Sequence, residues 1–329
     1  MDEPLVTVGI PVFNGEVSIL KALNSILDQS YKNLEIIVSD NCSTDSTWTI
    51  LEDFARDNPK VTIIRQKENI GLTNNFNFLV SSANGKYFMW AAHDDTRDPA
   101  YIAKCVSKLE DSDNYGLCAP RTKVKSGSND KYTWQSRLPK NLSSANEIER
   151  FKSAVREFPA VAMYGVYRTS SMRAANLLPN MIGSDLLFIQ ELALGSSIVE
   201  IEDYLFFYTE RENWNSKQQD FKVFFGSEKP GFFYSPFLLV TKRQLEIVFG
   251  SKIKLCRKLR LVVFLSYHFI FQTAIKIGMK AVRCIHPSIL RGLIAHRFYW
   301  TFMHPDSVEC LDEALFVKRI INPRFGIKS

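Results

Sequence analysis

The chain has 329 residues, of which 46% are hydrophobic and 12% aromatic, so its composition predicts a large packed core and argues against intrinsic disorder. Its six cysteines show no CxxC pair or other ligand spacing, which argues against a zinc site and a disulfide framework and favours a reducing compartment. The formal net charge of +6 is unevenly spread, because acids outnumber bases before about residue 120 whereas residues 251–305 contain no Asp or Glu.

The chain before about residue 125 alternates between strand-like and helix-like runs. The expected strands are Leu5–Phe13, Leu34–Asp40, 61–66 and 86–92. The expected helices cover 19–27, 43–57 and 72–85 and continue from Pro99, with Asp98 as the cap of the last one. This alternation predicts an α/β fold, in which a mostly parallel sheet is covered by helices on both faces.

The pattern is weaker after residue 125. We expect a helix over 143–158 with Ser143 or Ser144 near its N-terminus, and a strand over 159–172. A further helix is predicted to begin at Ser184 or Asp185 and to stop at Gly195, followed by strand-like segments.

Polar residues gather where the expected strands end. They are Asn14 and Glu16, Asp40 and Asn41, Asn69, and finally Asp94 and Asp95. Because ligands of open α/β sheets bind outside the carboxyl ends of the strands, these residues are predicted to face one crevice. No GxGxxG or Walker-type loop follows any of the strands, so neither a dinucleotide fingerprint nor a P-loop is present.

Asp94 and Asp95 admit two interpretations. The pair could cap the helix that follows, although Asp98 is better placed for that role. Alternatively it could bind a cation, because two adjacent carboxylates repel each other unless a positive charge lies beside them. Mg²⁺ and Mn²⁺ suit such a site, since hard divalent ions are often held by one or two carboxylates together with substrate phosphates.

Four motifs in order resemble those of the family-2 glycosyltransferases, which have the Rossmann-like GT-A fold. They are "IPVFN", "SDNCSTDST", "ENIGLTNNFN" and "AAHDD", the last at the position of the family's DxD motif, and the resemblance extends from about Leu5 to Trp214. The chain departs from the family pattern at Phe13, Asn41, Cys42, Phe76 and Ala92. The replacement of the first DxD acid by Ala92 leaves a ribose contact unassigned, and His93 is the candidate for it.

The resemblance implies a set of site residues. The residues that would contact the donor are Pro11, Phe13, Asn14 and Glu16 beside the nucleoside, Asp40 on the base, and Asn69, His93 and Asp94. Asp94 and Asp95 would hold Mn²⁺ or Mg²⁺ on the diphosphate. Asp185 resembles the family's catalytic base, although a favourable interaction with the helix dipole would also explain an acid there. Arg211 lies near the position of a His in many relatives.

The activity implied is that of a metal-dependent, inverting hexosyltransferase. It would move a sugar from a nucleotide-diphospho-sugar, with a UDP-sugar expected, to an acceptor hydroxyl in polysaccharide or glycolipid assembly. Two alternatives stay open: a non-catalytic nucleotide-sugar-binding module, which the missing DxD acid favours, and a nucleotidyltransferase with a similar sheet. The expected partners are the donor, a glycan or lipid-linked acceptor and an anionic membrane surface, and nucleic acid is not expected.

The chain is expected to divide into a glycosyltransferase domain at 1–215, a linker at 216–250 and a helical basic region at 251–329. Within the first domain the donor half would extend to about residue 125 and the acceptor half would cover 126–215. The N-terminus has no basic segment followed by an apolar one, so we expect a cytoplasmic protein.

The apolar run Leu261–Met279 is close to the roughly 20 residues that span a bilayer. However, His268, Gln272 and Lys276 are spaced to form one polar stripe, which predicts an interfacial helix with that stripe in water. Phe264, Phe271 and Ile275 would then face the lipid on the inner surface of the membrane. A soluble helical bundle is the alternative.

Overall fold

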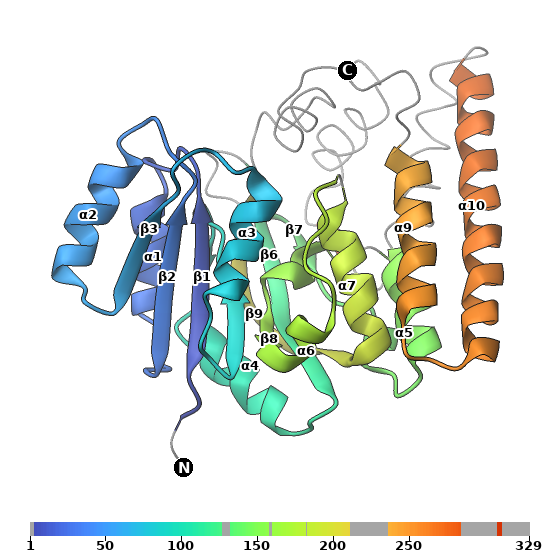
Figure 1. Ribbon diagram of the computed structural model, residues 1–329, viewed down its shortest axis with the longest axis horizontal. Helices are drawn as coiled ribbons and strands as arrows, with labels where there is room; N and C mark the ends of the chain where they lie inside the picture. Colours follow the sequence, from blue (N-terminus) through green and yellow to red (C-terminus); the bar gives the residue numbers. More distant parts are fainter. Residues whose placement is uncertain are drawn as a thin grey trace.

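The computed structural model describes residues 3–126, 132–157, 160–181, 183–210, 236–283 and 308–310. Its centre is a ten-stranded mixed sheet with helices on both of its faces (Figure 1). The main path through the sheet has the order β10-β7-β6-β8-β4-β1-β2-β3. The expected α/β sheet flanked by helices is therefore confirmed.

The first four strands form a parallel part of the sheet. Its strands are β1 (Val6–Val12), β2 (Leu34–Asp40), β3 (Val61–Arg65) and β4 (Tyr87–Trp90), and each pair of neighbours is parallel. In the register, Val12 of β1 lies opposite Asp40 of β2, and Asp40 lies opposite Arg65 of β3. The loops that follow these strands consequently begin at the same edge of the sheet.

The remaining strands make the sheet mixed. They are β5 (Thr96–Arg97), β6 (Tyr115–Ser126), β7 (Tyr132–Ser136), β8 (Val166–Arg168), β9 (Ser197–Glu210) and β10 (Val308–Cys310). β8 is antiparallel to β4 and to β6, while β9 is parallel to β6 and antiparallel to β5. The short β5–β9 pairing brings the segment that follows β4 next to β9.

Two hydrophobic clusters cover the two faces of the sheet. On one face, alternate β1 residues pack against α1 (Ile19–Leu27), α2 (Thr47–Asp57) and α4 (Tyr101–Glu110). On the other face, α3 (Leu72–Ser81), α6 (Thr169–Ala174) and α7 (Ser184–Gly195) pack around Trp90. Trp90 is fully buried, and its indole N–H donates to the Phe76 carbonyl at 3.0 Å, so this tryptophan belongs to the core.

A third cluster joins helices beyond α7. It contains apolar side chains of α5 (Glu147–Glu157), α7, α9 (Pro236–Gly250) and α10 (Leu255–Arg283). Residues 236–250 lie in the range expected to be a linker, yet they form a helix whose Gln244 amide donates to Gln190 of α7 at 3.0 Å. The rest of that range, 216–235, lies outside the described residues, as do 284–307 and 311–329 of the basic region.

Two expectations for local structure were wrong. Helix α5 begins at Glu147, because the side chain of Asn146, and not that of Ser143 or Ser144, accepts a free N–H of the first turn, that of Ile148, at 3.0 Å. The range 159–172, expected to be one strand, forms the 3₁₀ helix η2 (Ala160–Tyr164), β8 and α6. Its apolar run reflects burial in the second cluster, which does not distinguish a strand from a helix. A second 3₁₀ helix, η1, covers Lys140–Ser143.

No helix among the described residues is sufficiently long and apolar to cross a bilayer, α10 included.

Candidate functional site

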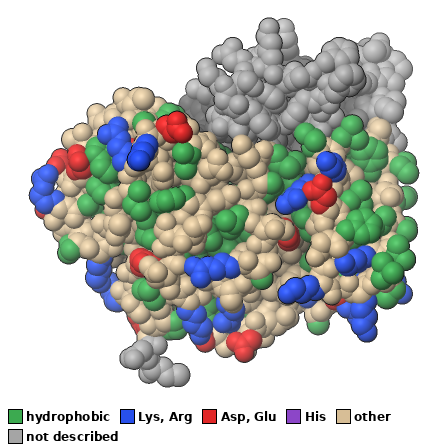
Figure 2. All heavy atoms as spheres, viewed as in Figure 1, with side chains coloured by type: hydrophobic (Ala, Val, Ile, Leu, Met, Phe, Trp, Pro, Cys, Tyr) green, Lys and Arg blue, Asp and Glu red, His purple; other side chains and the backbone are tan. Residues whose placement is uncertain are grey.

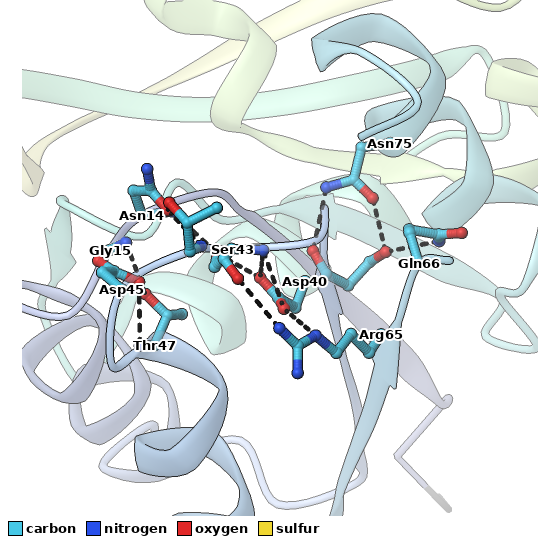
Figure 3. Close-up of polar contacts among 11 residues, drawn as sticks. Asn14, Gly15, Asp40, Ser43, Asp45, Thr47, Arg65, Gln66 and Asn75 are labelled. Carbon is cyan, nitrogen blue, oxygen red and sulfur yellow. Dashed lines mark hydrogen bonds and ion pairs between the residues drawn. The ribbon is translucent and has the colours of Figure 1, made fainter. Parts of the chain in front are cut away.

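The loops that follow β1 and β2 hold each other through hydrogen bonds (Figure 3). The main-chain N–H of Asn14 donates to the Ser43 hydroxyl at 2.9 Å. The side-chain Oδ1 of Asn14 accepts from the Thr44 N–H, also at 2.9 Å. The Gly15 N–H donates to the Thr47 hydroxyl at 2.8 Å. Asn14 has a positive φ of 52°, a left-handed conformation that Asn tolerates better than most residues. These contacts give the two loops one defined relative position.

The residues expected beside the nucleoside differ in exposure. Phe13 is 42% exposed, and Asn14 and Glu16 are exposed as well, whereas Pro11 is buried within β1. The Glu16 carboxylate accepts the Ser46 N–H at 2.9 Å, so it also helps to join the two loops. Phe13 therefore presents an aromatic side chain to solvent next to polar groups, which is an arrangement suited to a nucleoside.

Asp40, the expected base-binding residue, is fully buried. Its carboxylate accepts from the main-chain N–H of Ser43 at 3.2 Å and from the hydroxyl of the same residue, and it lies 3.4 Å from Nε of Arg65 (Figure 3). Arg65 also donates to the Ser43 carbonyl at 3.0 Å. Asp40 thus fixes the turn after β2 in the observed arrangement.

Asn69 and Asn41 connect the loops that follow β3 and β2. The Asn41 amide donates to the Asn69 side chain at 2.9 Å, and the Asn41 side-chain oxygen accepts from the Ile70 N–H at 2.9 Å. Buried Asn75 makes a similar connection from α3, since it accepts from the Ser39 hydroxyl at 2.6 Å and donates to the Ser39 carbonyl at 3.0 Å. The polar clusters expected at the ends of the first three strands are therefore brought together.

His93 lies against the start of α1. Its Nδ1 is 3.0 Å from the Ser18 hydroxyl, and a Cβ on Gly15 would come within 2.9 Å of the same nitrogen. The segment that follows β4 is in this way attached to the loop that follows β1. His93 is half-buried at this junction, where it borders the loop that carries Phe13 and Asn14.

Asp94 and Asp95 have different surroundings, although they are neighbours in sequence. Asp95 is fully buried, and its Oδ1 accepts from the main-chain N–H of Thr209 in β9 at 2.9 Å. Asp94 is only partly buried. The helix-cap interpretation applies to neither of them, because Asp98 accepts the Ala100 N–H at 2.9 Å just before α4.

Tyr164, at the end of η2, is a buried tyrosine on which Asp94, Asp95 and Asp185 all act electrostatically. Burial raises the pKa of its phenol well above the ordinary value. The nearby groups that raise this pKa further are Tyr208, Asp95, Asp94 and Asp185. The ring of Tyr164 also contacts those of Phe206 and Tyr208 in β9, at centroid distances of 5.6 and 6.5 Å. All three predicted carboxylates are therefore within electrostatic range of one aromatic group.

Asp185 is the second residue of α7, as expected. Burial raises the pKa of its carboxyl, while the N–H groups of Leu186 and of Asp185 itself lower it in part. The preceding Gly183 has a φ of 82°, a conformation that glycine adopts without strain. A raised pKa makes the carboxylate a stronger base than an ordinary Asp.

The segment leading to α7 is attached to α3. The Asn77 side chain donates to the Leu178 carbonyl at 2.9 Å and accepts from the Leu178 N–H at 3.0 Å. Thr73 of the same helix donates to the Asn180 side chain at 2.9 Å. Helix α3 thus supports the chain segment that leads to Asp185.

Asp94 and Asp95 suit a divalent ion whose coordination shell is completed by a bound ligand. Among the described residues, no group of three or more His, Cys, Asp or Glu side chains is placed to hold a metal ion by itself. Asp94 and Asp95 are two hard oxygen donors, and a Mg²⁺ or Mn²⁺ ion commonly takes one or two carboxylates and obtains the rest of its ligands from phosphates and water. The donor set therefore fits an ion that binds together with a diphosphate. Arg211 lies outside the described residues.

Several site residues were not found from the sequence. Ser43 and Arg65 bind Asp40, Thr209 binds Asp95, and Tyr164 is within electrostatic range of the carboxylates. Ser43 is within a recognised motif and could have been selected for that reason. The other three depend on contacts between distant segments, which leave no local pattern.

Comparison with known proteins gives a family. Residues 7–173, just over half of the chain, match the model described as glycosyl transferase family 2. An uncharacterized glycosyltransferase of Haemophilus influenzae is 39% identical over 111 residues, which are 34% of this chain and 34% of that protein. One of Rickettsia prowazekii is also 39% identical over 111 residues, with 34% of each chain covered. The chain spans about a third of the length of these curated relatives.

The fold is similar to that of a solved structure. A crystal structure of Staphylococcus aureus TarS 1–349 has a TM-score of 0.56 and 17% identity, and the match covers 77% of this chain and 68% of that one. The complex of the same protein with UDP-GlcNAc matches with a TM-score of 0.56 and 18% identity over 77% and 69%. At this level of identity the likeness concerns the fold alone.

Proposed function

The chain belongs to glycosyl transferase family 2, and from this premise we propose that it transfers a sugar from a nucleotide-diphospho-sugar to an acceptor hydroxyl with inversion at the anomeric carbon. The observation that carries the proposal is that Asp95 is bonded to Thr209 of β9, whose neighbour Tyr208 contacts the ring of Tyr164, and that Asp94, Asp95 and Asp185 all act electrostatically on this one tyrosine. A donor-binding pair and a basic carboxylate in one neighbourhood are what a single-displacement transfer requires.

We propose that the donor binds at the joined loops after β1, β2 and β3. Phe13, Asn14 and Glu16 would border the nucleoside beside Pro11, with Asn69 and His93 at its edges. The contact of Asp40 with the base stays a prediction, and it has to be reconciled with the burial of that carboxylate. A UDP-sugar is the expected donor, and this is supported by a protein of similar fold that is seen in complex with UDP and with UDP-GlcNAc.

Asp94, assisted by Asp95, would hold Mn²⁺ or Mg²⁺ against the donor diphosphate. The bound ion would supply positive charge that stabilises the departing diphosphate. Because Asp95 already accepts the Thr209 N–H, Asp94 is the better placed of the two to contribute a carboxylate oxygen. Asp95 would then also position the segment that carries Asp94.

Asp185 would act as the general base. It would remove the proton from the acceptor hydroxyl, whose oxygen attacks the anomeric carbon on the face opposite the departing diphosphate. The raised pKa of Asp185 supports this role, because a partly desolvated carboxylate takes up a proton more readily. We propose that residues 126–215 form the acceptor half and that the acceptor is a glycan or lipid-linked sugar in polysaccharide or glycolipid assembly.

A non-catalytic nucleotide-sugar-binding module is the second candidate. The observation that favours it is the replacement of the first DxD acid by Ala92, together with the use of Asp95 to hold β9. Such a module would bind the donor without cleaving it.

The test is a panel of UDP-, GDP- and dTDP-sugars measured with Mn²⁺, with Mg²⁺ and with EDTA. Calorimetry would report binding, and release of free nucleoside diphosphate would report slow hydrolysis of the donor. We expect one nucleotide class to bind only with a divalent ion and to be hydrolysed. Binding without hydrolysis or transfer would support the binding module. Formation of a nucleoside triphosphate and a sugar 1-phosphate when pyrophosphate is added to the nucleotide sugar would indicate a nucleotidyltransferase, and binding of no nucleotide sugar would overturn the proposal.

A further inference from the structure

A stripe of exposed apolar side chains extends along helix α10. It consists of Leu255, Leu259, Val263, Tyr267 and Ile270, which are three or four positions apart and therefore project from one side of the helix. Each is more than half exposed, from 54% for Leu259 to 70% for Val263. At 1.5 Å per residue the stripe is about 22 Å long. This set of five residues is called the α10 stripe below.

The opposite side of α10 is already packed. Leu261, Phe264 and Leu265 are buried in the cluster formed with α5, α7 and α9. An ion pair between Arg257 and Glu147 of α5 and the stacking of Phe269 on Phe237 at 4.9 Å also attach the helix. Figure 1 shows α10 as the outermost helix at this end of the molecule, beside α9. The helix is therefore apolar on two sides, and one side alone is used in packing.

This orientation corrects the one expected from the sequence. Gln272, expected in water, is buried, and burial lowers the pKa of His268, helped by the charge of Arg156. Phe264, expected to face lipid, is in the core. Phe271 is 42% exposed, whereas the side chains of Ile275 and Lys276 lie outside those described. His268 and Gln272 thus face the protein, and the exposed apolar side of the helix is the α10 stripe.

The end of α10 next to the stripe is basic. Lys252 and Lys254 precede the helix, Arg260 lies within it, and all three are exposed. Figure 2 shows hydrophobic side chains along the edge formed by α9 and α10, with Lys and Arg near its lower end. No Asp or Glu occurs between residues 251 and 305. The surface around the stripe is therefore suited to an anionic partner.

A contiguous exposed apolar surface usually marks an interaction site. A second copy of the chain is a poor occupant, because two acid-free helices would bring Lys and Arg together without carboxylates to pair with them. An anionic bilayer satisfies both features, since its acyl boundary accepts apolar side chains and its headgroups accept basic ones.

We propose that α10 docks on the surface of an anionic lipid bilayer, with the α10 stripe at the acyl boundary and Lys252, Lys254 and Arg260 at the headgroups. The helix lies in the plane of the surface and does not cross it. The proposed membrane attachment does not depend on the transfer reaction, so it can be tested separately.

The test is flotation of the full chain with vesicles of phosphatidylglycerol and phosphatidylcholine, or of phosphatidylcholine alone, at low and high salt. We expect binding to the anionic vesicles that weakens at high salt. The double variant Leu259→Ser/Val263→Ser should lose this binding, whereas Val17→Ser, which alters a side chain that is 96% exposed elsewhere, should retain it. Thermal unfolding followed by circular dichroism would establish that each variant is folded.

A charge-matched pair of variants tests the basic residues. Lys252→Gln/Lys254→Gln should weaken binding by about fivefold for each lysine, while Lys60→Gln/Lys67→Gln, with the same change in net charge, should bind as the unaltered chain does. Equal flotation of the folded Leu259→Ser/Val263→Ser variant and the unaltered chain would overturn the proposal. Failure of the unaltered chain to bind anionic vesicles would also overturn the proposal. If light scattering then showed a dimer of the unaltered chain that Leu259→Ser/Val263→Ser dissociates, the α10 stripe would be a dimer interface.

Discussion

The carboxylate of Asp95 accepts a hydrogen bond at 2.9 Å from the main-chain N–H of Thr209, which is 114 residues away in sequence. This bond attaches the segment after β4 to β9. Since β9 also carries Tyr208, whose ring contacts Tyr164, the bond helps to set the position of the Asp94–Asp95 pair relative to Tyr164.

The first prediction concerns this bond. Asp95→Ala removes the acceptor of the Thr209 N–H, and leaving a buried donor unsatisfied costs about 1–3 kcal/mol in the free energy of unfolding. Asp95→Asn keeps a side-chain oxygen and should cost less. Urea unfolding of both variants measures the difference, and equal stability of Asp95→Ala and the unaltered chain would contradict the structural role.

The second prediction concerns the metal. Loss of a group that supports a metal ligand lowers metal affinity by roughly 10- to 100-fold. Asp94→Asn alters a proposed ligand itself, so it should weaken donor binding in the presence of a divalent ion by at least this factor. Its stability should change little, because Asp94 is only partly buried. Asp57→Asn, at the exposed end of α2, is the control. Donor titrations with and without EDTA make the measurement, and an unchanged affinity would show that Asp94 is not a ligand.

The third prediction separates binding from chemistry. Asp185→Asn should keep donor affinity but lower the transfer rate by about 100- to 10,000-fold, since a base is needed in the chemical step alone. Glu191→Gln is the control, because Glu191 lies on the same helix and is bound to the Asn176 side chain. If instead Glu191→Gln lost transfer and Asp185→Asn retained it, the base would be Glu191.

The fourth prediction is a pH dependence. Because burial raises the pKa of Asp185 in the folded protein, its carboxylate takes up a proton at a higher pH than an ordinary Asp, whose pKa is about 3.9. The rate of transfer at saturating substrate should therefore fall as the pH decreases through this raised pKa. In the residual activity of Asp185→Asn, the decrease in transfer rate at low pH should be absent. If the decrease persists unchanged, another group is responsible for it.

The fifth prediction concerns the support of α7. Asn77→Ala removes both hydrogen bonds to Leu178 and should lower the transfer rate more than it lowers donor affinity, because it loosens the segment that leads to Asp185. Asn74→Ala, on the same helix and bonded to the Ile70 carbonyl just before it, is the matched control. Parallel measurements of kcat and of the donor Kd make the comparison. Equal effects of the two variants would argue against a positioning role for Asn77.

The parallel half of the sheet could be predicted from sequence. β2 has the predicted bounds, and Asp185 lies in the first turn of a helix that ends at Gly195, as expected. These features depend on residues that are close in the chain: short β-rich runs, helical spacing and residues that end helices. For the same reason the polar residues after β1, β2 and β3 could be expected to meet, because parallel strands place their carboxyl ends at one edge.

Only the tertiary structure decided the roles of the individual carboxylates and the orientation of α10. Asp40 ends β2 and Asp95 follows β4, but the partners that hold these buried carboxylates are Arg65 and Thr209, which the sheet pairings bring to them. Helix α10 has apolar residues on two sides, so its periodicity does not indicate which side is packed. That choice depends on the apolar surface that α5, α7 and α9 together present, which exists only after the chain has folded.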